Sequence, residues 1–153
     1  MKFIMLIGCA GSGKTTIGKS LVNENTILLS SDDLRAKIFG DENDQKHNKE
    51  IFAEMENRTI NLLSSGKSVV YDATNLNAIR RAHLIDTLNG VFAETAPDLE
   101  FIAVAVECYA VEAKARQSKR ERKVPFAVID RQIAQYEKPT YAEGWNRIYC
   151  ISN

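Results

Sequence analysis

Residues 8–15 read Gly8-Cys9-Ala10-Gly11-Ser12-Gly13-Lys14-Thr15, which is the pattern G-x-x-x-x-G-K-[ST] of a phosphate-binding loop. An apolar run, residues 3–7, precedes the pattern, and residues 14–22 have helical periodicity. Such a loop requires a strand before it and a helix after it, because its backbone N–H groups and the helix N-terminus then face the same anion. We therefore predict a nucleoside triphosphate site at this loop.

Two side chains of the loop have predicted roles beyond the backbone. Lys14 is expected to reach the β- and γ-phosphates of ATP and to act in catalysis, and the Thr15 hydroxyl is expected to bind Mg²⁺. The alternative is a chance glycine-rich turn, which average residue usage predicts in about one chain of this length in two hundred. The residues predicted to bind ATP here are Gly8, Ala10, Gly11, Ser12, Gly13, Lys14, Thr15 and Thr16.

Length and composition predict one ordinary globular domain. The 153 residues suffice for one sizeable core, so we predict a single domain over residues 1–153. Twenty basic residues balance twenty acidic ones, so contact with nucleic acid would need a local positive patch. The three cysteines lack C-x-x-C spacing, which fits a reducing compartment, and no apolar run reaches membrane-spanning length. We expect a cytoplasmic protein with no membrane partner.

Apolar runs alternate with helix-period segments along the chain. Strands are expected at residues 3–7, 26–29, 68–71, 99–106 and 147–151, and helices at 14–22, 32–39, about 48–63, about 77–88 and 111–119. This alternation predicts an α/β protein with the P-loop kinase fold, a parallel sheet flanked by helices on both faces. Ligands of such sheets bind at the carboxyl ends of the strands, so polar side chains after each strand are expected to converge.

Asp32 and Arg35 follow the second predicted strand. Helix capping by Ser31, with acidic residues in the first turn, explains this segment as well as function does. In the functional interpretation, Asp32 accepts a proton from an attacking hydroxyl. Arg35, three residues on and on the same helix face, would bind a phosphate of the acceptor.

Asp72 ends the third predicted strand, and Asn75 follows it in the sequence Asp-Ala-Thr-Asn-Leu-Asn. For Asn75 and Asn77 the alternative is helix capping. An ionised carboxylate at the end of a buried strand needs a cation or a hydrogen-bond donor. Arg35 is the expected partner of Asp72, and a place near Mg²⁺ is the second possibility. Arg35, Asp72 and Asn75 are the predicted substrate-binding residues.

A basic segment, residues 116–125, contains Arg116, Arg120, Arg122 and Lys123 and ends at Pro125. Such runs are usually solvated helix ends. In a protein with a phosphate loop, phosphoryl transfer gains from arginines brought in by a closing segment. We therefore predict a lid over residues 116–125, with Arg116 and Arg120 contacting phosphates and Arg120 taking part in catalysis.

Together these motifs resemble the kinase domain of phage and bacterial polynucleotide 5′-hydroxyl kinases. The matching segments are residues 8–15, 31–35, 72–77 with Arg80 and Arg81, and 116–120 followed by Val124 and Pro125, in the same order over nearly the whole chain. The resemblance implies that Asp32 is the general base that activates a 5′-hydroxyl and that Arg35 binds the 3′-phosphate of the acceptor. It also implies that Asp72 steadies Arg35 and that Arg120 contacts the donor phosphates. The chain departs from the family pattern at Ala73, which separates Asp72 from Thr74, and its lid is about one residue shorter.

Three functions remain open from the sequence. The first is ATP- and Mg²⁺-dependent transfer of the γ-phosphate to the 5′-hydroxyl end of DNA or RNA, or of a nucleoside 3′-phosphate. The second is a small-molecule kinase acting on a nucleoside, sugar or antibiotic with the same donor site. The third is a non-transferring ATP-binding module, which would need neither Asp32 nor a basic lid.

Overall fold

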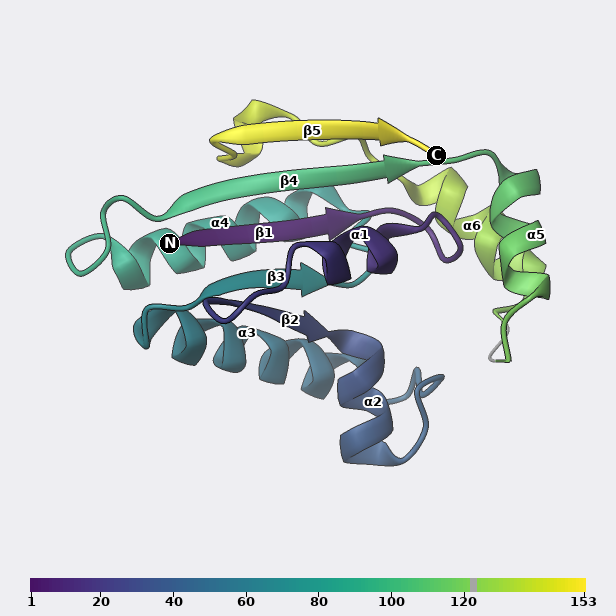
Figure 1. Ribbon diagram of the computed structural model, residues 1–153, viewed down its shortest axis with the longest axis horizontal. Coiled ribbons are helices and arrows are strands. Elements are labelled where there is room, and N and C mark those ends of the chain that lie inside the picture. Colours follow the sequence, from purple (N-terminus) through teal and green to yellow (C-terminus); the bar gives the residue numbers. More distant parts are fainter. Residues whose placement is uncertain (122–123) are drawn as a thin grey trace.

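The computed structural model of the protein describes residues 1–121 and 124–153, and within them five strands form one parallel sheet (Figure 1). The strand order is β2-β3-β1-β4-β5. The strands are β1 (Lys2–Ile7), β2 (Thr26–Ser30), β3 (Ser68–Asp72), β4 (Glu100–Glu107) and β5 (Arg147–Ser152). The helices are α1 (Lys14–Ser20), α2 (Ser31–Phe39), α3 (Asn48–Ser64), α4 (Ala78–Phe92), α5 (Ala110–Ser118), α6 (Phe126–Gln135) and the 3-10 helix η1 (Tyr141–Glu143).

The alternating side chains of β1 bury both faces of the sheet. Phe3, Met5 and Ile7 pack in a cluster with residues of α3 and α4, which cover one face. Ile4 and Leu6 pack in a second cluster on the opposite face, where α1 lies (Figure 1). The strands therefore read as continuous apolar runs, as expected for a parallel sheet between two layers of helices. The predicted α/β fold is confirmed.

Local side chains explain where two site-bearing helices begin. The N-cap of α2 is Ser30, whose Oγ accepts a hydrogen bond from the Asp33 N–H at 3.3 Å. The sequence suggested Ser31, so the cap lies one residue earlier, because β2 runs directly into α2. The N-cap of α4 is Asn77, whose Oδ1 accepts from the Arg80 N–H at 2.9 Å, as the capping alternative for Asn77 predicted.

Helix α6 was missed by the sequence analysis. It begins after Pro125 and buries Ile129 completely against Cys9 and Ala113. The signal is present in the sequence as Phe126, Ile129 and Ile133, spaced three and four residues apart. This helix packs with α5 beside the phosphate loop, so it belongs to the surroundings of the site.

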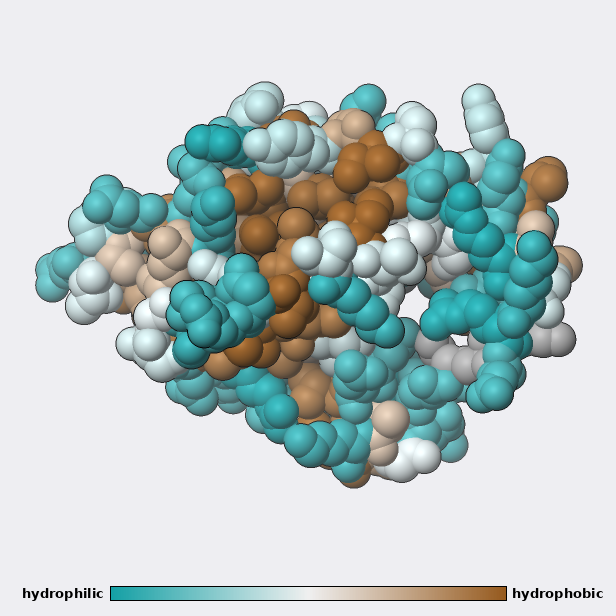
Figure 2. All heavy atoms as spheres, in the orientation of Figure 1, coloured by the Kyte–Doolittle hydropathy of each residue, from teal (hydrophilic) through white to brown (hydrophobic). Residues whose placement is uncertain are grey.

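The α1 face of the sheet carries a broad apolar surface, brown in Figure 2. Val104 pairs in register with Tyr149, and Val106 with Ile151, so these side chains share that face. Tyr149 and Ile151 are exposed on β5. Within the described residues, no helix combines the length and the apolar composition needed to cross a bilayer.

Candidate active site

The phosphate loop, residues 8–15, connects β1 to α1 at the carboxyl edge of the sheet (Figure 1). Gly11 and Gly13 have left-handed φ angles of 81° and 93°, which L-residues rarely adopt. The Gly8 N–H donates to the Thr74 carbonyl at 3.0 Å, and the Ser12 N–H donates to the Cys9 carbonyl at 3.2 Å. The glycines therefore curl the loop as the sequence pattern predicted.

Lys14 and Thr15 begin α1 directly after the glycines. The Lys14 Nζ lies 3.4 Å from the Cys9 carbonyl, so the ammonium group is folded back over the loop. The Thr15 Oγ1 donates a 2.8 Å hydrogen bond to Oδ2 of Asp72. Thr16 is exposed on the next position of the helix.

Asp72 is buried at the end of β3, where its carboxylate faces Thr15. Burial raises the pKa of Asp72 above its ordinary value of 3.8, while the nearby Lys14 and the Thr15 hydrogen bond oppose that rise. A carboxylate and a hydroxyl oxygen 2.8 Å apart beside a phosphate loop are the hard oxygen donors that suit Mg²⁺. These two side chains fit a magnesium site, Thr15 as a ligand and Asp72 beside it.

The expected pairing of Asp72 with Arg35 is wrong. Among the described residues, the ion pair of Arg35 is with Asp32, at 3.2 Å between Nη1 and Oδ1. Arg35 points from α2 toward α3, where its Nη2 donates to Asn48 Oδ1 at 2.9 Å and its guanidinium lies 5.7 Å from the Phe52 ring centroid. Packing between α2 and α3 decides this direction, and the second possibility for Asp72, a place near Mg²⁺, agrees with its hydrogen bond.

Asp32 lies in the first turn of α2 with 44% of its side chain exposed. It follows β2, the neighbour of β3, so Asp32 and Asp72 end adjacent strands at one edge of the sheet. The carboxylate is held by Arg35, which is 6% exposed and whose Nε is buried without a hydrogen-bond partner in the described structure. A half-exposed carboxylate with a fixed neighbour is able to accept a proton from a hydroxyl at this edge.

Asn75 lies in the loop between β3 and α4 and has a left-handed φ of 51°. Its Nδ2 donates to the Leu6 carbonyl at 2.7 Å and to the Ala73 carbonyl at 3.2 Å. The side-chain amide is therefore engaged with backbone at the end of β1. Contact of Asn75 with a substrate stays a prediction.

The predicted lid begins within α5. Arg116 donates from Nη1 to the carbonyls of Gly11 and Ser12, at 3.1 and 3.2 Å, so its guanidinium rests on the phosphate loop. Arg120 follows the end of α5 and is exposed. The predicted lid residues Arg122 and Lys123 lie outside the described residues. The lid arginines stay predicted phosphate contacts, and Arg116 has an observed contact with the loop backbone.

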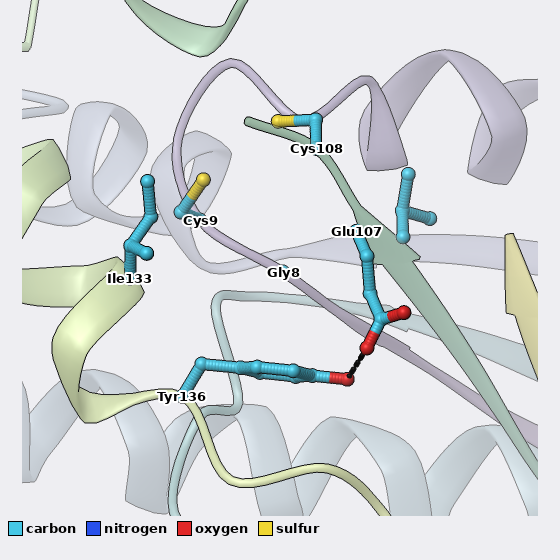
Figure 3. A pocket seen from close by; sticks show the side chains of 7 residues that line it. Gly8, Cys9, Glu107, Cys108, Ile133 and Tyr136 are labelled. Atoms are coloured by element: carbon cyan, nitrogen blue, oxygen red, sulfur yellow. Dashed lines mark hydrogen bonds between the residues drawn. The ribbon is translucent and has the colours of Figure 1, made fainter. Parts of the chain in front are cut away.

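Sequence reasoning missed a small cavity beside the phosphate loop, shown in Figure 3. Its lining includes Cys9 from the loop, Glu107 and Cys108 from the end of β4, and Tyr136 after α6. The Tyr136 hydroxyl donates a 2.6 Å hydrogen bond to Glu107 Oε2. Burial, together with the neighbouring Cys108, raises the pKa of the Cys9 thiol to about 11. The rule that polar residues after a strand line the site would have found Glu107 and Cys108, had it been applied to the fourth strand.

The sheet order, the glycine-rich loop after the central strand and the helices beside that loop define a P-loop kinase fold. A family model described as an AAA domain matches residues 3–139, and the chain belongs to this family. A shikimate kinase from Caldicellulosiruptor saccharolyticus is 35% identical over 97 residues, which cover 56% of this chain and 56% of the relative. The chain thus spans about half the length of the curated relatives it matches.

Solved structures share the fold at low sequence identity. A chain of a Pnkp1/Rnl/Hen1 RNA repair complex superposes with a TM-score of 0.67 at 23% identity, covering 88% of this chain and 43% of that chain. A gluconokinase from Sinorhizobium meliloti 1021 superposes with a TM-score of 0.62 at 18% identity, covering 99% of this chain and 82% of that chain. Such identities establish the architecture, and different kinases share it.

Proposed function

We propose that the protein is an ATP- and Mg²⁺-dependent kinase that transfers the γ-phosphate to the 5′-hydroxyl at the end of a nucleic acid. The observation that carries the proposal is the half-exposed carboxylate of Asp32, held by Arg35 at the same sheet edge as the phosphate loop. A module that only binds ATP has no use for a base at this place. The sequence motifs 31–35 and 72–77 support a nucleic-acid end as the acceptor.

In the proposed mechanism, residues that follow different strands act on different groups of the two substrates. Lys14 and the loop N–H groups neutralise the donor phosphates. Thr15 would hold Mg²⁺ with Asp72 beside it, and the bound ion would offset phosphate charge. Asp32 takes the proton from the attacking hydroxyl, whose oxygen bonds to the γ-phosphorus as the bond from that phosphorus to the bridging β-phosphate oxygen breaks and ADP leaves. Arg120 approaches from the lid and stabilises the charge that develops on the transferred group.

Arg35 would bind the phosphate on the 3′ side of the reacting nucleotide. Its Nε is a buried donor without a partner in the described structure, and an anion would reach it only after a local movement of α2 and α3 that opens the site. A buried donor left unpaired is costly, and a ligand oxygen would remove that cost. The resemblance to chains of RNA repair complexes in fold agrees with this acceptor.

A small-molecule kinase is the second candidate. The observation that favours it is that both Nη atoms of Arg35 already bond to Asp32, Ser31 and Asn48. In that case Arg35 serves to orient Asp32 and needs no phosphate on the acceptor. The curated relatives, which are shikimate kinases, agree with this alternative.

Comparing two acceptors separates these functions. Wild-type protein, Arg35→Ala and Arg35→Lys would be assayed with labelled ATP on a nucleoside 3′-monophosphate and on the bare nucleoside, with Lys37→Ala on the same helix as the control. A charge-assisted hydrogen bond is worth roughly 1.5–3 kcal/mol, or about ten- to a hundredfold in kcat/KM. We expect the wild type to prefer the 3′-monophosphate by this factor, and Arg35→Ala to lose most of that preference.

The control Lys37→Ala should keep the preference, because Lys37 is exposed on α2. Arg35→Lys keeps a charge and reports on the guanidinium itself if Arg35→Ala is unstable. Equal use of both acceptors by the wild-type protein would refute the nucleic-acid proposal and favour the small-molecule kinase.

A further inference from the structure

Arg81 is a buried arginine in the first turns of α4, with a side chain that is 1% exposed. Its Nε donates to Glu143 Oε1 at 2.7 Å and its Nη2 to Oε2 at 3.1 Å, a bidentate ion pair. Nη1 donates to the Asn75 carbonyl at 2.8 Å, and Nη2 also donates to the Glu137 carbonyl at 2.8 Å. One side chain therefore joins α4 to two segments that are about sixty residues apart in the sequence.

Glu143 anchors the far side of this contact. Its carboxylate also accepts from the Thr140 N–H at 2.9 Å and from Trp145 Nε1 at 3.1 Å. Burial alone would raise the pKa of Glu143, but these donors and Arg81 hold that pKa below its ordinary value. The segment 137–145, here called the strap, is thus fixed to α4 through a carboxylate that stays ionised.

On its other side, Arg81 is connected to the phosphate loop through the loop between β3 and α4. Asn75 is the one non-glycine residue with positive φ in the described chain, and Arg81 binds its carbonyl. Its side chain bonds to the Leu6 carbonyl, and the adjacent Thr74 carbonyl accepts from the Gly8 N–H. The β3–α4 loop, residues 73–77, therefore supports the first residue of the phosphate loop.

The same loop directly follows Asp72, the last residue of β3, whose carboxylate accepts a hydrogen bond from the Thr15 hydroxyl. Arg81 is thus linked through the loop backbone both to the start of the phosphate loop and to the carboxylate beside the magnesium position. Being almost completely buried, Arg81 is out of reach of any ligand. Any effect it has on nucleotide binding must pass through these residues.

We propose that Arg81 is a positioning residue for the nucleotide site: its ion pair with Glu143 clamps the strap to the β3–α4 loop and so sets Asp72 and the phosphate loop for Mg²⁺-ATP. This rests on the proposed kinase function for the identity of the ligand. It follows from this proposal that the strap influences nucleotide affinity, although it lies far from the phosphate loop in the sequence.

Two conservative substitutions test the clamp, one that keeps the charge of the side chain and one that keeps its size. Arg81→Lys keeps the positive charge but loses the planar fork, and Glu143→Gln keeps the size but loses the ionised partner. The control is Arg80→Lys, the same change at the neighbouring exposed residue. Equilibrium binding of a fluorescent ATP analogue would be measured with and without Mg²⁺, beside the melting temperature. Fluorescence of Trp145, the single tryptophan of the chain, reports on the clamp itself.

We expect both clamp variants to weaken analogue binding in Mg²⁺ by about tenfold, the lower end of the effect of residues that orient metal ligands. Binding without Mg²⁺ should change less, and Arg80→Lys should match the wild type. A purely structural role would lower the melting temperature and leave the affinity of the folded protein unchanged. That result, or failure of both clamp variants to fold, would overturn the proposal.

The assay contains no acceptor, so it is independent of the acceptor assignment. If the wild-type protein binds the analogue but phosphorylates no 5′-hydroxyl, the proposed function fails and the clamp remains testable. If it binds no nucleotide at all, the donor site fails and the clamp proposal fails with it.

Discussion

Replacing Gly11 by alanine should damage the site in a way that the same change at Gly40 does not. Both glycines have left-handed φ angles, 81° at Gly11 and 72° at Gly40. An added Cβ at Gly40 meets nothing within 4 Å, whereas at Gly11 it would lie 2.4 Å from the carbonyl oxygen of Ala113 in α5. The pair therefore separates backbone strain from a clash between the phosphate loop and α5.

The strain is worth roughly 1–2 kcal/mol for an L-residue, and the smaller freedom of the unfolded alanine chain offsets about 0.4–1 kcal/mol of it. Gly40→Ala should thus cost about 1 kcal/mol, which lowers Tm by about 2–4 °C at this chain length. At Gly11 the clash adds about 1–3 kcal/mol, the usual cost of overpacking. It also displaces α5 from the loop, where Arg116 bonds to the Gly11 and Ser12 carbonyls.

Thermal unfolding followed by circular dichroism and binding of a fluorescent ATP analogue would be measured on both variants. We expect Gly11→Ala to lower Tm at least twice as far as Gly40→Ala and to weaken nucleotide binding, while Gly40→Ala leaves binding unchanged. If the two variants are alike in both measurements, the contact between the loop and α5 has no energetic weight and the reasoning is refuted.

Three further results are expected. Asp32→Asn should lower the rate of phosphate transfer by about 10²–10⁴-fold with ATP affinity nearly unchanged, because it removes the base. If turnover per folded molecule equals that of the wild type, Asp32 has only a structural role in the first turn of α2. Because the pKa of Asp72 is raised in the folded protein, its ionisation opposes folding, and Asp72→Asn should raise Tm at pH 7. The difference in Tm between the variant and the wild type should shrink as the pH falls through the raised pKa. A difference that stays constant with pH would contradict this prediction. A thiol reagent at pH 8 should label exposed Cys150 well before buried Cys9, whose pKa is about 11, as mass spectrometry of the labelled peptides would show.

The fold and the edge of the sheet that carries the site were predictable because their signals are local. Glycines followed by Lys14, and acidic residues directly after two strands, depend only on neighbours in the sequence and on the rule for strand ends. The partner of Arg35 was not predictable in this way. Asp32, three residues before Arg35 on the same helix face, is a local candidate, but the choice between Asp32 and Asp72 depends on how α2 packs against Asn48 and Phe52 of α3.

The contacts that α5 and the strap make were not predictable from the sequence for a similar reason. Arg116 lies in a run of charges that usually marks a solvated helix end, and only the docking of α5 brings it to the Gly11 carbonyl. Arg81 and Glu143 are 62 residues apart, so their pairing exists only after α4 and the strap have packed. Buried long-range ion pairs of this kind leave no spacing to recognise.

The central position of β1 in the sheet also affects the order in which the strands can pair during synthesis. Phe3 lies opposite Val69 in β3 and Phe101 in β4, so this strand has partners 66 and 98 residues further along the chain. A nascent chain emerges N-terminus first, and contacts between distant residues form slowly. The apolar residues 3–7 are therefore translated 66 residues before their partners in β3 and 98 residues before those in β4, so β1 is paired on both sides only after β4 has been made.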